Sequence, residues 1–205
     1  KIKNKNFFTY GFAKEANFRI LNSTYKKNQS KFDMIISIQG LKKTKLKNIQ
    51  LNLMGSYNIL NAASAIALCL HIGINIKVIR NVLKKFSGIE RRLTKVFEDK
   101  DREFFDDYAH HPTEIKSVLN SIRLINKDRK IISVFQPHRY SRLKLLKKEF
   151  ASSFKDSDLV ILCPVYPAGE KVDKQYNRVD FSKLISEKSN VQVVTVNNQK
   201  DLKSF

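Results

Sequence analysis

The sequence predicts an α/β fold in two parts, residues 1–88 and residues 89–205. In the first part, strand-like segments precede two segments with helical periodicity. In the second part, strand-like and helix-like segments alternate, which is typical of a parallel, doubly wound sheet. Between them, residues 87–92 combine a helix stop, a turn and a charge cluster, after which the strand pattern restarts. We therefore expect the domain boundary there.

The amino-terminal part reads as strands followed by a helix pair. Residues rich in β-branched and aromatic side chains predict strands, and the polar segment 26–31 predicts a loop or hairpin tip. An Ala/Leu-rich segment predicts a helix that Gly73 ends, and a second amphipathic helix follows. The predicted strands are 7–12, 32–38 and 47–53, and the predicted helices are 58–70 and 76–86.

The carboxyl-terminal part begins with a predicted hairpin around residues 98–101 and continues as alternating helices and strands. Pro112 suits the first position of a helix, with Glu114 in the first turn. The last residues predict the start of a further helix. The strands are expected at 93–97, 103–107, 131–135, 159–163 and 191–196, and the helices at 112–125, 143–154, 181–188 and 200–205.

The composition limits the classes of function. The net charge of +20 invites a nucleic-acid interpretation, but the lysines are spread along the chain without a basic block or interleaved aromatic residues. No apolar run approaches the roughly 20 residues of a membrane span. Cys69 and Cys163 lie in apolar runs, which indicates buried thiols in the reducing cytoplasm. The start at Lys1, without a methionine or a signal peptide, suggests a segment of a longer protein.

Three polar clusters follow three predicted strands: residues 106–111, 137–142 and 164–171. Ligands of doubly wound sheets bind beyond the carboxyl ends of the strands, so we expect these clusters to converge. Arg139 and Arg142 begin a helix and can bind a carboxylate or phosphate, although a surface pair of arginines is the alternative.

Other groups leave alternatives open. Asp106, Asp107, His110 and His111 have a spacing that permits a metal site, but few of them can face one point, so no metal site is predicted. Capping by Asp107 and a structural role for His111 compete with both a metal and a catalytic role.

Two amides, Asn58 and Asn61, share a helix face, either as caps or as a grip on a planar ligand such as a nucleobase. Glu170, in the turn 166–170, has no role that the pattern assigns.

These motifs also carry a family resemblance. Asp106–Glu114 reads Asp-Asp-Tyr-Ala-His-His-Pro-Thr-Glu, and residues 136–142 read Gln-Pro-His-Arg-Tyr-Ser-Arg. Together with the segments 9–12, 55–63, 88–92 and 166–170, they resemble the Mur ligases over nearly the whole chain. The resemblance implies the end of a central ATPase-type α/β domain in residues 1–88 and a Rossmann-like, doubly wound carboxyl-terminal domain in residues 89–205, truncated at its end.

The resemblance further implies an ATP-dependent ligase of peptidoglycan synthesis. Within the family, the chain is most similar to the members that phosphorylate the lactyl carboxylate of UDP-N-acetylmuramate and join it to L-alanine. Mg²⁺ is expected with ATP, with its ligands mainly outside this chain. No nucleic acid and no membrane insertion are implied.

By motif, Asn58 and Asn61 would contact adenine, Arg92 the nucleotide and Asp107 the ribose hydroxyls. The amino-acid side would be lined by Tyr108, His110, His138, Arg139 and Arg142, with His110 and Arg139 as the catalytic candidates. The loop 106–112 would then act as a two-sided hinge between nucleotide and amino acid.

The chain also departs from the family pattern. Tyr57 and Leu93 replace a usual His and Phe, and residues 1–205 contain no Gly-x-x-x-x-Gly-Lys-Thr/Ser phosphate loop and no central-domain metal acid. We therefore expect this segment to be inactive alone. The alternatives are a murein-peptide ligase, which normally lacks the Gln-Pro-His-Arg-Tyr string, a metal-dependent hydrolase on Asp107 and His110, and a basic nucleic-acid-binding module.

Overall fold

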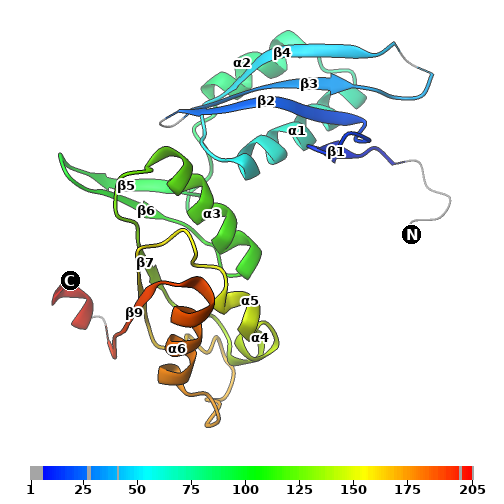
Figure 1. Cartoon of the computed structure of the whole chain (residues 1–205). Helices are drawn as coiled ribbons and strands as arrows, with labels where there is room; N and C mark the ends of the chain where they lie inside the picture. The colour runs from blue at the N-terminus through cyan, green and yellow to red at the C-terminus, as the bar shows by residue number, and fades with distance from the viewer. Residues whose placement is uncertain (1–6, 27–28, 41, 199, 205) are drawn as a thin grey trace. The chain divides into compact units, whose positions relative to one another are not determined.

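The computed structural model describes residues 7–26, 29–40, 42–198 and 200–204. The chain divides into two compact units, residues 1–90 and residues 91–205. Each unit has a buried apolar core of its own, and Figure 1 shows the elements of both.

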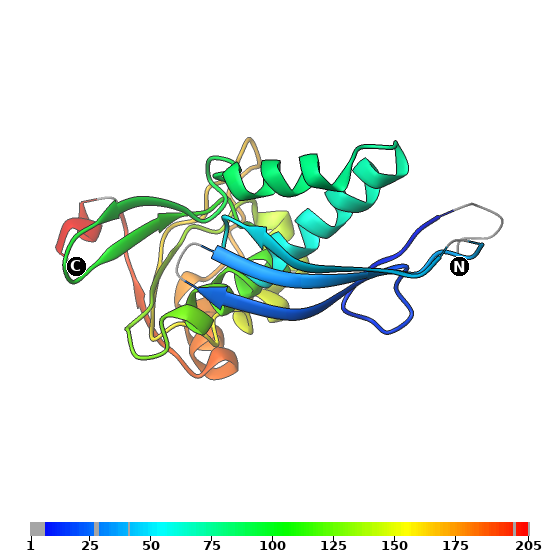
Figure 2. The ribbon, with the colours of Figure 1, turned by 90° about the horizontal axis from the view of Figure 1, so that it is seen from above.

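A four-stranded sheet in the order β1-β2-β3-β4 forms the first unit. β2 pairs antiparallel with β3, and β3 with β4, whereas β1 pairs parallel with β2. Figures 1 and 2 show both helices on the same side of this sheet. The elements are β1 (Tyr10–Gly11), β2 (Phe18–Lys26), β3 (Gln29–Ile36), β4 (Thr44–Leu51), α1 (Ser56–His71) and α2 (Ile76–Lys85).

The core of the first unit lies between the sheet and the two helices. Alternate residues of β2, β3 and β4 point to this core, as the period of two in a strand requires. Asn75 caps α2 by accepting the Lys77 N–H, and Gly73 takes a φ of +86° after α1. The fully buried members of this core are Ile20, Phe32, Met34, Ile49, Ile59, Ala63 and Ile66.

Asp33 joins three strands from inside the sheet. Its carboxylate accepts the Asn48 N–H at 2.9 Å and the Asn22 side-chain N–H at 3.0 Å. Both asparagines have a positive φ, 51° for Asn22 and 54° for Asn48, and both lie where the strand register shifts. Asn tolerates this conformation better than most residues. Each of the two bulges therefore has a residue that suits its backbone and a hydrogen bond to Asp33.

The helices of the first unit follow the prediction, but its strands differ. Residues 58–70 and 76–86 lie in α1 and α2 as expected, apart from one residue at the end of α2. The nine-residue strand β2 was not predicted, because a polar stretch with a bulge at Asn22 interrupts its alternation. Only Tyr10–Gly11 of the predicted strand 7–12 is a strand.

The second unit contains two sheets. β5 and β6 form an antiparallel hairpin, and β7, β8 and β9 form a parallel sheet in that order. The elements are β5 (Thr94–Glu98), β6 (Glu103–Asp106), α3 (Pro112–Ile125), β7 (Ile132–Phe135), α4 (Tyr140–Leu145), α5 (Lys147–Ala151), β8 (Leu159–Leu162), α6 (Arg178–Ser189), β9 (Gln192–Thr195) and the 3-10 turn η1 (Asp201–Ser204).

Helices α3 to α6 share one apolar cluster with the parallel sheet. Val160 and Leu162 of β8 point into this cluster and are fully buried. Ile161 of β8 points to the opposite face, where it packs with Cys163 and Leu202. The α/β class and the parallel sheet are therefore confirmed, and helices α3 to α6 of the second unit contribute to one core.

Two details of the second unit correct the prediction. β6 pairs with β5 and is not one of the three strands of the parallel sheet, so only two of the three polar clusters follow strands of one sheet. The predicted helix 143–154 is broken at Leu146, whose φ of −114° and ψ of 27° leave the helical region. Cys163 is buried as expected, whereas Cys69 is only partly buried.

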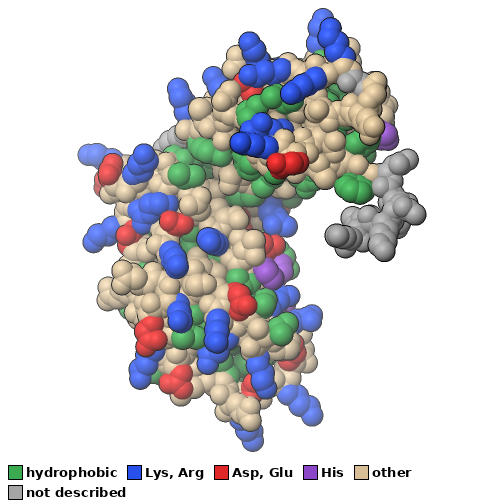
Figure 3. All heavy atoms as spheres, turned by 45° about the vertical axis from the view of Figure 1, so that its right-hand side comes forward, with side chains coloured by type: hydrophobic (Ala, Val, Ile, Leu, Met, Phe, Trp, Pro, Cys, Tyr) green, Lys and Arg blue, Asp and Glu red, His purple; other side chains and the backbone are tan. Residues whose placement is uncertain are grey.

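Basic side chains are distributed over the visible surface of both units rather than gathered in one patch, as Figure 3 shows. This distribution agrees with the spread of lysines along the sequence. Among the residues that the structure describes, no helix is both long and apolar enough to cross a membrane.

Candidate functional site

Three loops of the second unit meet at the carboxyl ends of β6, β7 and β8. The loop after β7 and the loop after β8 are joined by main-chain hydrogen bonds. The Tyr166 N–H donates to the Pro137 oxygen at 2.8 Å, and the Arg139 N–H donates to the Tyr166 oxygen at 2.9 Å. His138 and Tyr166 form a parallel bridge between them. The two loops are therefore held as a short extension of the parallel sheet.

Four aromatic rings run in a row across all three loops. The ring centroids of Tyr108 and His110 lie 5.0 Å apart, those of His110 and His138 6.3 Å, and those of His138 and Tyr166 5.4 Å. Tyr108 and Tyr166, at the ends of the row, are each 53% exposed. The predicted convergence of the three polar clusters is confirmed by these contacts, although β6 lies outside the parallel sheet.

The ring of His110 has a defined hydrogen-bond direction. Its Nδ1 lies 2.9 Å from the main-chain oxygen of Tyr108. A carbonyl oxygen can only accept a hydrogen bond, so Nδ1 carries the hydrogen. In the neutral ring Nε2 then holds a lone pair. A base with this tautomer can accept a proton from a bound ligand at Nε2.

His111 and Glu114 have structural roles at the start of α3. The His111 Nδ1 accepts the Thr113 N–H at 3.3 Å, and a Glu114 oxygen accepts the N–H groups of His110 and His111 at 3.0 and 3.1 Å. Burial acts to raise the pKa of Glu114, but these two main-chain donors lower it overall. This is a capping box, with Pro112 at the first helical position as predicted.

The two arginines of the site approach it from the start of α4. Arg139 is exposed and has a φ of +71°, whereas Arg142 is partly buried, with its Nη1 3.5 Å from the His110 oxygen. His138 lies beside them, and burial, followed by the charges of Arg142 and Arg139, lowers its pKa. Its Nδ1 is buried without a hydrogen-bond partner among the described residues. A cationic surface thus adjoins a neutral imidazole.

Asp107 is already engaged with the main chain. Its two oxygens accept the N–H groups of Leu93 and Ala109, each at 2.7 Å. Burial raises the pKa of Asp107, an effect that outweighs these hydrogen bonds and the charge of Arg92. Leu93 has a φ of +50°, and the carboxylate helps to hold it there. The alternative structural role of Asp107 therefore has direct support.

The predicted amides of the first unit differ in environment. Asn58 is 8% exposed and donates from its side chain to the Met54 oxygen at 2.8 Å. Asn61 is exposed on the same helix. Asn58 thus secures the turn before α1, and Asn61 presents its amide to solvent. Asn58 and Asn61 lie on the first unit, whereas Arg92 and Asp107 lie on the second.

Sequence reasoning missed the contribution of Ser141 and Glu170. Ser141 donates its N–H at 3.0 Å and its hydroxyl at 2.5 Å to the two carboxylate oxygens of Glu170. The turn residues before Glu170 were recognised, but its partner lies 29 residues away. No local pattern could have identified that contact.

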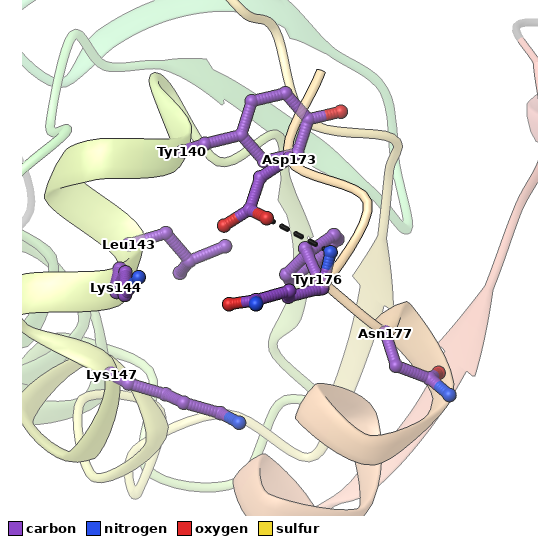
Figure 4. Close-up of a pocket in the computed structure, with 8 residues that line it drawn as sticks. Tyr140, Leu143, Lys144, Lys147, Asp173, Tyr176 and Asn177 are labelled. Atoms are coloured by element: carbon purple, nitrogen blue, oxygen red, sulfur yellow. Dashed lines mark hydrogen bonds between the residues drawn. The ribbon is translucent and has the colours of Figure 1, made fainter. Parts of the chain in front are cut away.

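A pocket of about 160 Å³ lies beside α4 and was also not predicted. Figure 4 shows Tyr140 and Tyr176 with Lys144 and Lys147 around it. The buried Tyr176 hydroxyl has no partner among the described residues, and burial raises the pKa of Tyr176 to about 12. None of the predicted site residues lines this pocket. In the described part of the chain, no group of three or more His, Cys, Asp or Glu side chains is arranged to hold a metal ion.

Comparison with protein families identifies both units. Residues 91–202 match the Mur ligase glutamate ligase domain, and residues 1–69 match the Mur ligase middle domain. The chain belongs to the Mur ligase family. The family resemblance of the motifs is thereby confirmed.

Two relatives of this Mur ligase chain carry the same name. The chain is 45% identical over its whole length to the UDP-N-acetylmuramate–L-alanine ligase of Pelagibacter ubique, covering 44% of that protein. It is 40% identical to the ligase of the same name from Dictyoglomus turgidum, over 97% of the chain and 41% of the relative. The chain thus spans less than half the length of these relatives.

Solved structures agree on the fold. The UDP-N-acetylmuramate–alanine ligase of Thermotoga maritima matches 96% of the chain and 41% of its own length, with a TM-score of 0.70 and 24% identity. A murein peptide ligase from Psychrobacter arcticus matches 96% of the chain and 39% of its own length, with a TM-score of 0.60 and 20% identity.

Proposed function

We propose that this chain supplies the middle and carboxyl-terminal parts of an ATP-dependent ligase that joins L-alanine to UDP-N-acetylmuramate in the cytoplasm. The full ligase, as we use the term, contains residues 1–205 together with a phosphate loop and a UDP-sugar-binding domain. The observation that carries the proposal is the meeting of Arg142, His110 and His138 at one edge of the second unit, with Arg139 next to His138 in the chain. The names of the relatives agree with it.

The proposed reaction has two steps. ATP transfers its terminal phosphoryl group to the lactyl carboxylate, which gives an acyl phosphate and ADP. The ammonium group of L-alanine then loses one proton to Nε2 of His110, and the amine attacks the acyl carbon. The C–N bond forms as the C–O bond to phosphate breaks, and the second nitrogen proton leaves with the phosphate.

The two arginines suit the carboxylate of L-alanine. A guanidinium group can bind a carboxylate through two parallel hydrogen bonds, and Arg139 directly precedes α4 while Arg142 lies in its first turn. Because burial and the arginines keep His138 neutral, it adds a ring to the site without adding a third positive charge. Tyr108 and His138 form the wall against which a small side chain would rest.

On the nucleotide side we assign Asn61 and Asn58 to adenine, Arg92 to the nucleotide and Asp107 to the ribose. Burial penalises the charged form of Asp107, and two ribose hydroxyls donating to its free lone pairs would reduce that penalty. The Asn58 amide nitrogen already donates one hydrogen to the Met54 oxygen, so its second N–H and its side-chain oxygen remain for a ligand. Mg²⁺ is expected to accompany ATP, and no residue of this chain is assigned to it.

The rival activity is ligation of a murein peptide rather than of free alanine. The full ligase should be supplied with ATP, UDP-N-acetylmuramate and either L-alanine or a tripeptide that begins with L-alanine. We expect the alanine product to form at least 100-fold faster, because the two arginines are proposed to bind the free carboxylate of alanine, which is part of an amide bond in the tripeptide (~3 kcal/mol at ~1.4 kcal/mol per tenfold). Preferential ligation of the tripeptide would support the murein-peptide activity instead.

A further inference from the structure

Arg139 adopts a backbone conformation that needs external support. Its φ is +71°, a region that is costly for a residue with a Cβ atom. α4 begins at the next residue, and the Arg139 side chain makes no capping hydrogen bond to it. The first N–H groups of a helix need acceptors from elsewhere. A hydrogen-bond acceptor from outside α4 is therefore needed to stabilise the backbone at Arg139 and the start of the helix.

That support comes from Glu170. Its two oxygens accept the N–H and the hydroxyl of Ser141, the second residue of α4. A carboxylate that accepts such donors at a helix start replaces the missing N-cap. The backbone turn at Arg139, where α4 begins, is thus stabilised by the carboxylate of Glu170 from a different loop.

The Glu170 carboxylate is itself aimed by a tight turn. The Glu170 N–H donates to the Pro167 oxygen at 3.1 Å, and the central residues Ala168 and Gly169 have φ values of 49° and 86°. Positive φ at both central positions is a type I′ turn, which favours glycine. Tyr166, just before this turn, is hydrogen-bonded to the main chain on both sides of His138. The loop 166–170 therefore contacts the chain around Arg139 in two places, through the Tyr166 main chain and through the Glu170 carboxylate.

We propose that Glu170 is a positioning residue, which acts through Ser141 to hold Arg139 and His138 in the geometry that receives the carboxylate of the amino acid. This inference rests on the proposed function for its substrate but not for its geometry. Glu170 and Arg139 also attract each other, and the Ser141 hydroxyl lowers the pKa of Glu170, so the carboxylate is ionised at neutral pH.

The geometry is tested first, in the 205-residue chain without ligand. In a ¹H–¹⁵N NMR titration, the Ser141 amide resonance should follow the ionisation of Glu170 below its ordinary pKa. In Glu170→Gln this titration should vanish, and the Arg139 amide should shift, whereas Glu187→Gln, which changes an exposed acid on α6, should alter neither. A Ser141 amide that ignores the ionisation of Glu170 would overturn the proposal.

The functional consequence is tested in the full ligase. Glu170→Gln and Ser141→Ala should each raise the KM for L-alanine about tenfold, with the KM for ATP and the melting temperature nearly unchanged, whereas Ser141→Thr should retain affinity. Unchanged alanine kinetics in both variants would contradict a positioning role. If the unsubstituted ligase uses no alanine while the NMR titration behaves as expected, the proposed function fails and the positioning of Arg139 stands.

Discussion

Nδ1 of His110 lies 2.9 Å from the main-chain oxygen of Tyr108, two residues earlier in the same loop. This contact fixes the tautomer of the ring and directs Nε2 away from the loop's own main chain. With the hydrogen on Nδ1, Nε2 of the neutral ring is the atom that can accept a proton. The proton-transfer role proposed for His110 depends on this hydrogen bond.

Replacing His110 should therefore affect chemistry more than binding. In the full ligase, His110→Ala should lower kcat by about 10²–10⁴-fold, the usual contribution of a general base. The measurement is initial rates at saturating ATP, UDP-N-acetylmuramate and L-alanine. His111→Asn is the matched control, because Asn is a good N-cap and should keep α3 and the rate intact. Equal losses in both variants would show that the effect is structural.

Arg139 should matter for the affinity of the amino acid. Arg139→Lys keeps the charge but cannot form two parallel hydrogen bonds, so we expect the KM for L-alanine to rise about tenfold or more. The KM for ATP should remain the same. Arg102→Ala, at the exposed tip of the β5–β6 hairpin, serves as the control for loss of an arginine. Alanine kinetics that match the unsubstituted enzyme would remove Arg139 from the site.

His138 should titrate below the ordinary value for histidine, near 6.5. Burial is the main cause, and Arg142 and Arg139 add to it. ¹³C-detected NMR of the ring should therefore show a neutral His138 at pH 7, and Arg142→Ala should raise its pKa. Because the folded-state pKa is lowered, the stability that the neutral ring contributes is present above pH ~6.5 and is lost as the pH falls. A His138 that titrates above 6.5 would contradict this environment.

Asp33 should make the first unit sensitive to acid. The Asn48 N–H, followed by the Asn22 side chain, lowers the pKa of Asp33. Its contribution is therefore full above the unfolded value near 3.9 and is lost as the pH falls through the folded-state pKa. At pH 7, Asp33→Asn should lower the free energy of unfolding by about 1–3 kcal/mol in urea melts, since one bulge loses its acceptor. The difference between the two proteins should shrink as the pH falls through the folded-state pKa of Asp33.

Most helices were predictable because their apolar periodicity and caps are local, whereas the break at Leu146 between α4 and α5 was not predicted. Residues 112–125 form α3 with the predicted proline at its start, and Gly73 ends α1 as expected. The strand β2 was missed, since the bulge at Asn22 depends on Asp33 of the next strand. The convergence of the three loops was predicted from the order of the elements. The hydrogen bonds between Ser141 and Glu170 were not predicted, because they join residues that are distant in sequence.

The roles of the site residues were only partly accessible from motifs. The motif around His110 predicted a loop with catalytic candidates. The hydrogen bond to Tyr108 that defines the tautomer of His110 is visible only in the three-dimensional structure. Asp107 was assigned to the ribose, whereas the structure adds main-chain contacts with Leu93 and Ala109. The contact with Leu93 joins two segments that are 14 residues apart in the sequence.

The most direct test of the proposed ligase uses UDP-N-acetylmuramate labelled with ¹⁸O in its lactyl carboxylate. The full ligase is incubated with this substrate, ATP and L-alanine, and the released phosphate is analysed by mass spectrometry. An acyl-phosphate route predicts one ¹⁸O atom in each phosphate, with one alanine amide formed per phosphate. Phosphate without ¹⁸O, or phosphate release without an alanine amide, would contradict the account.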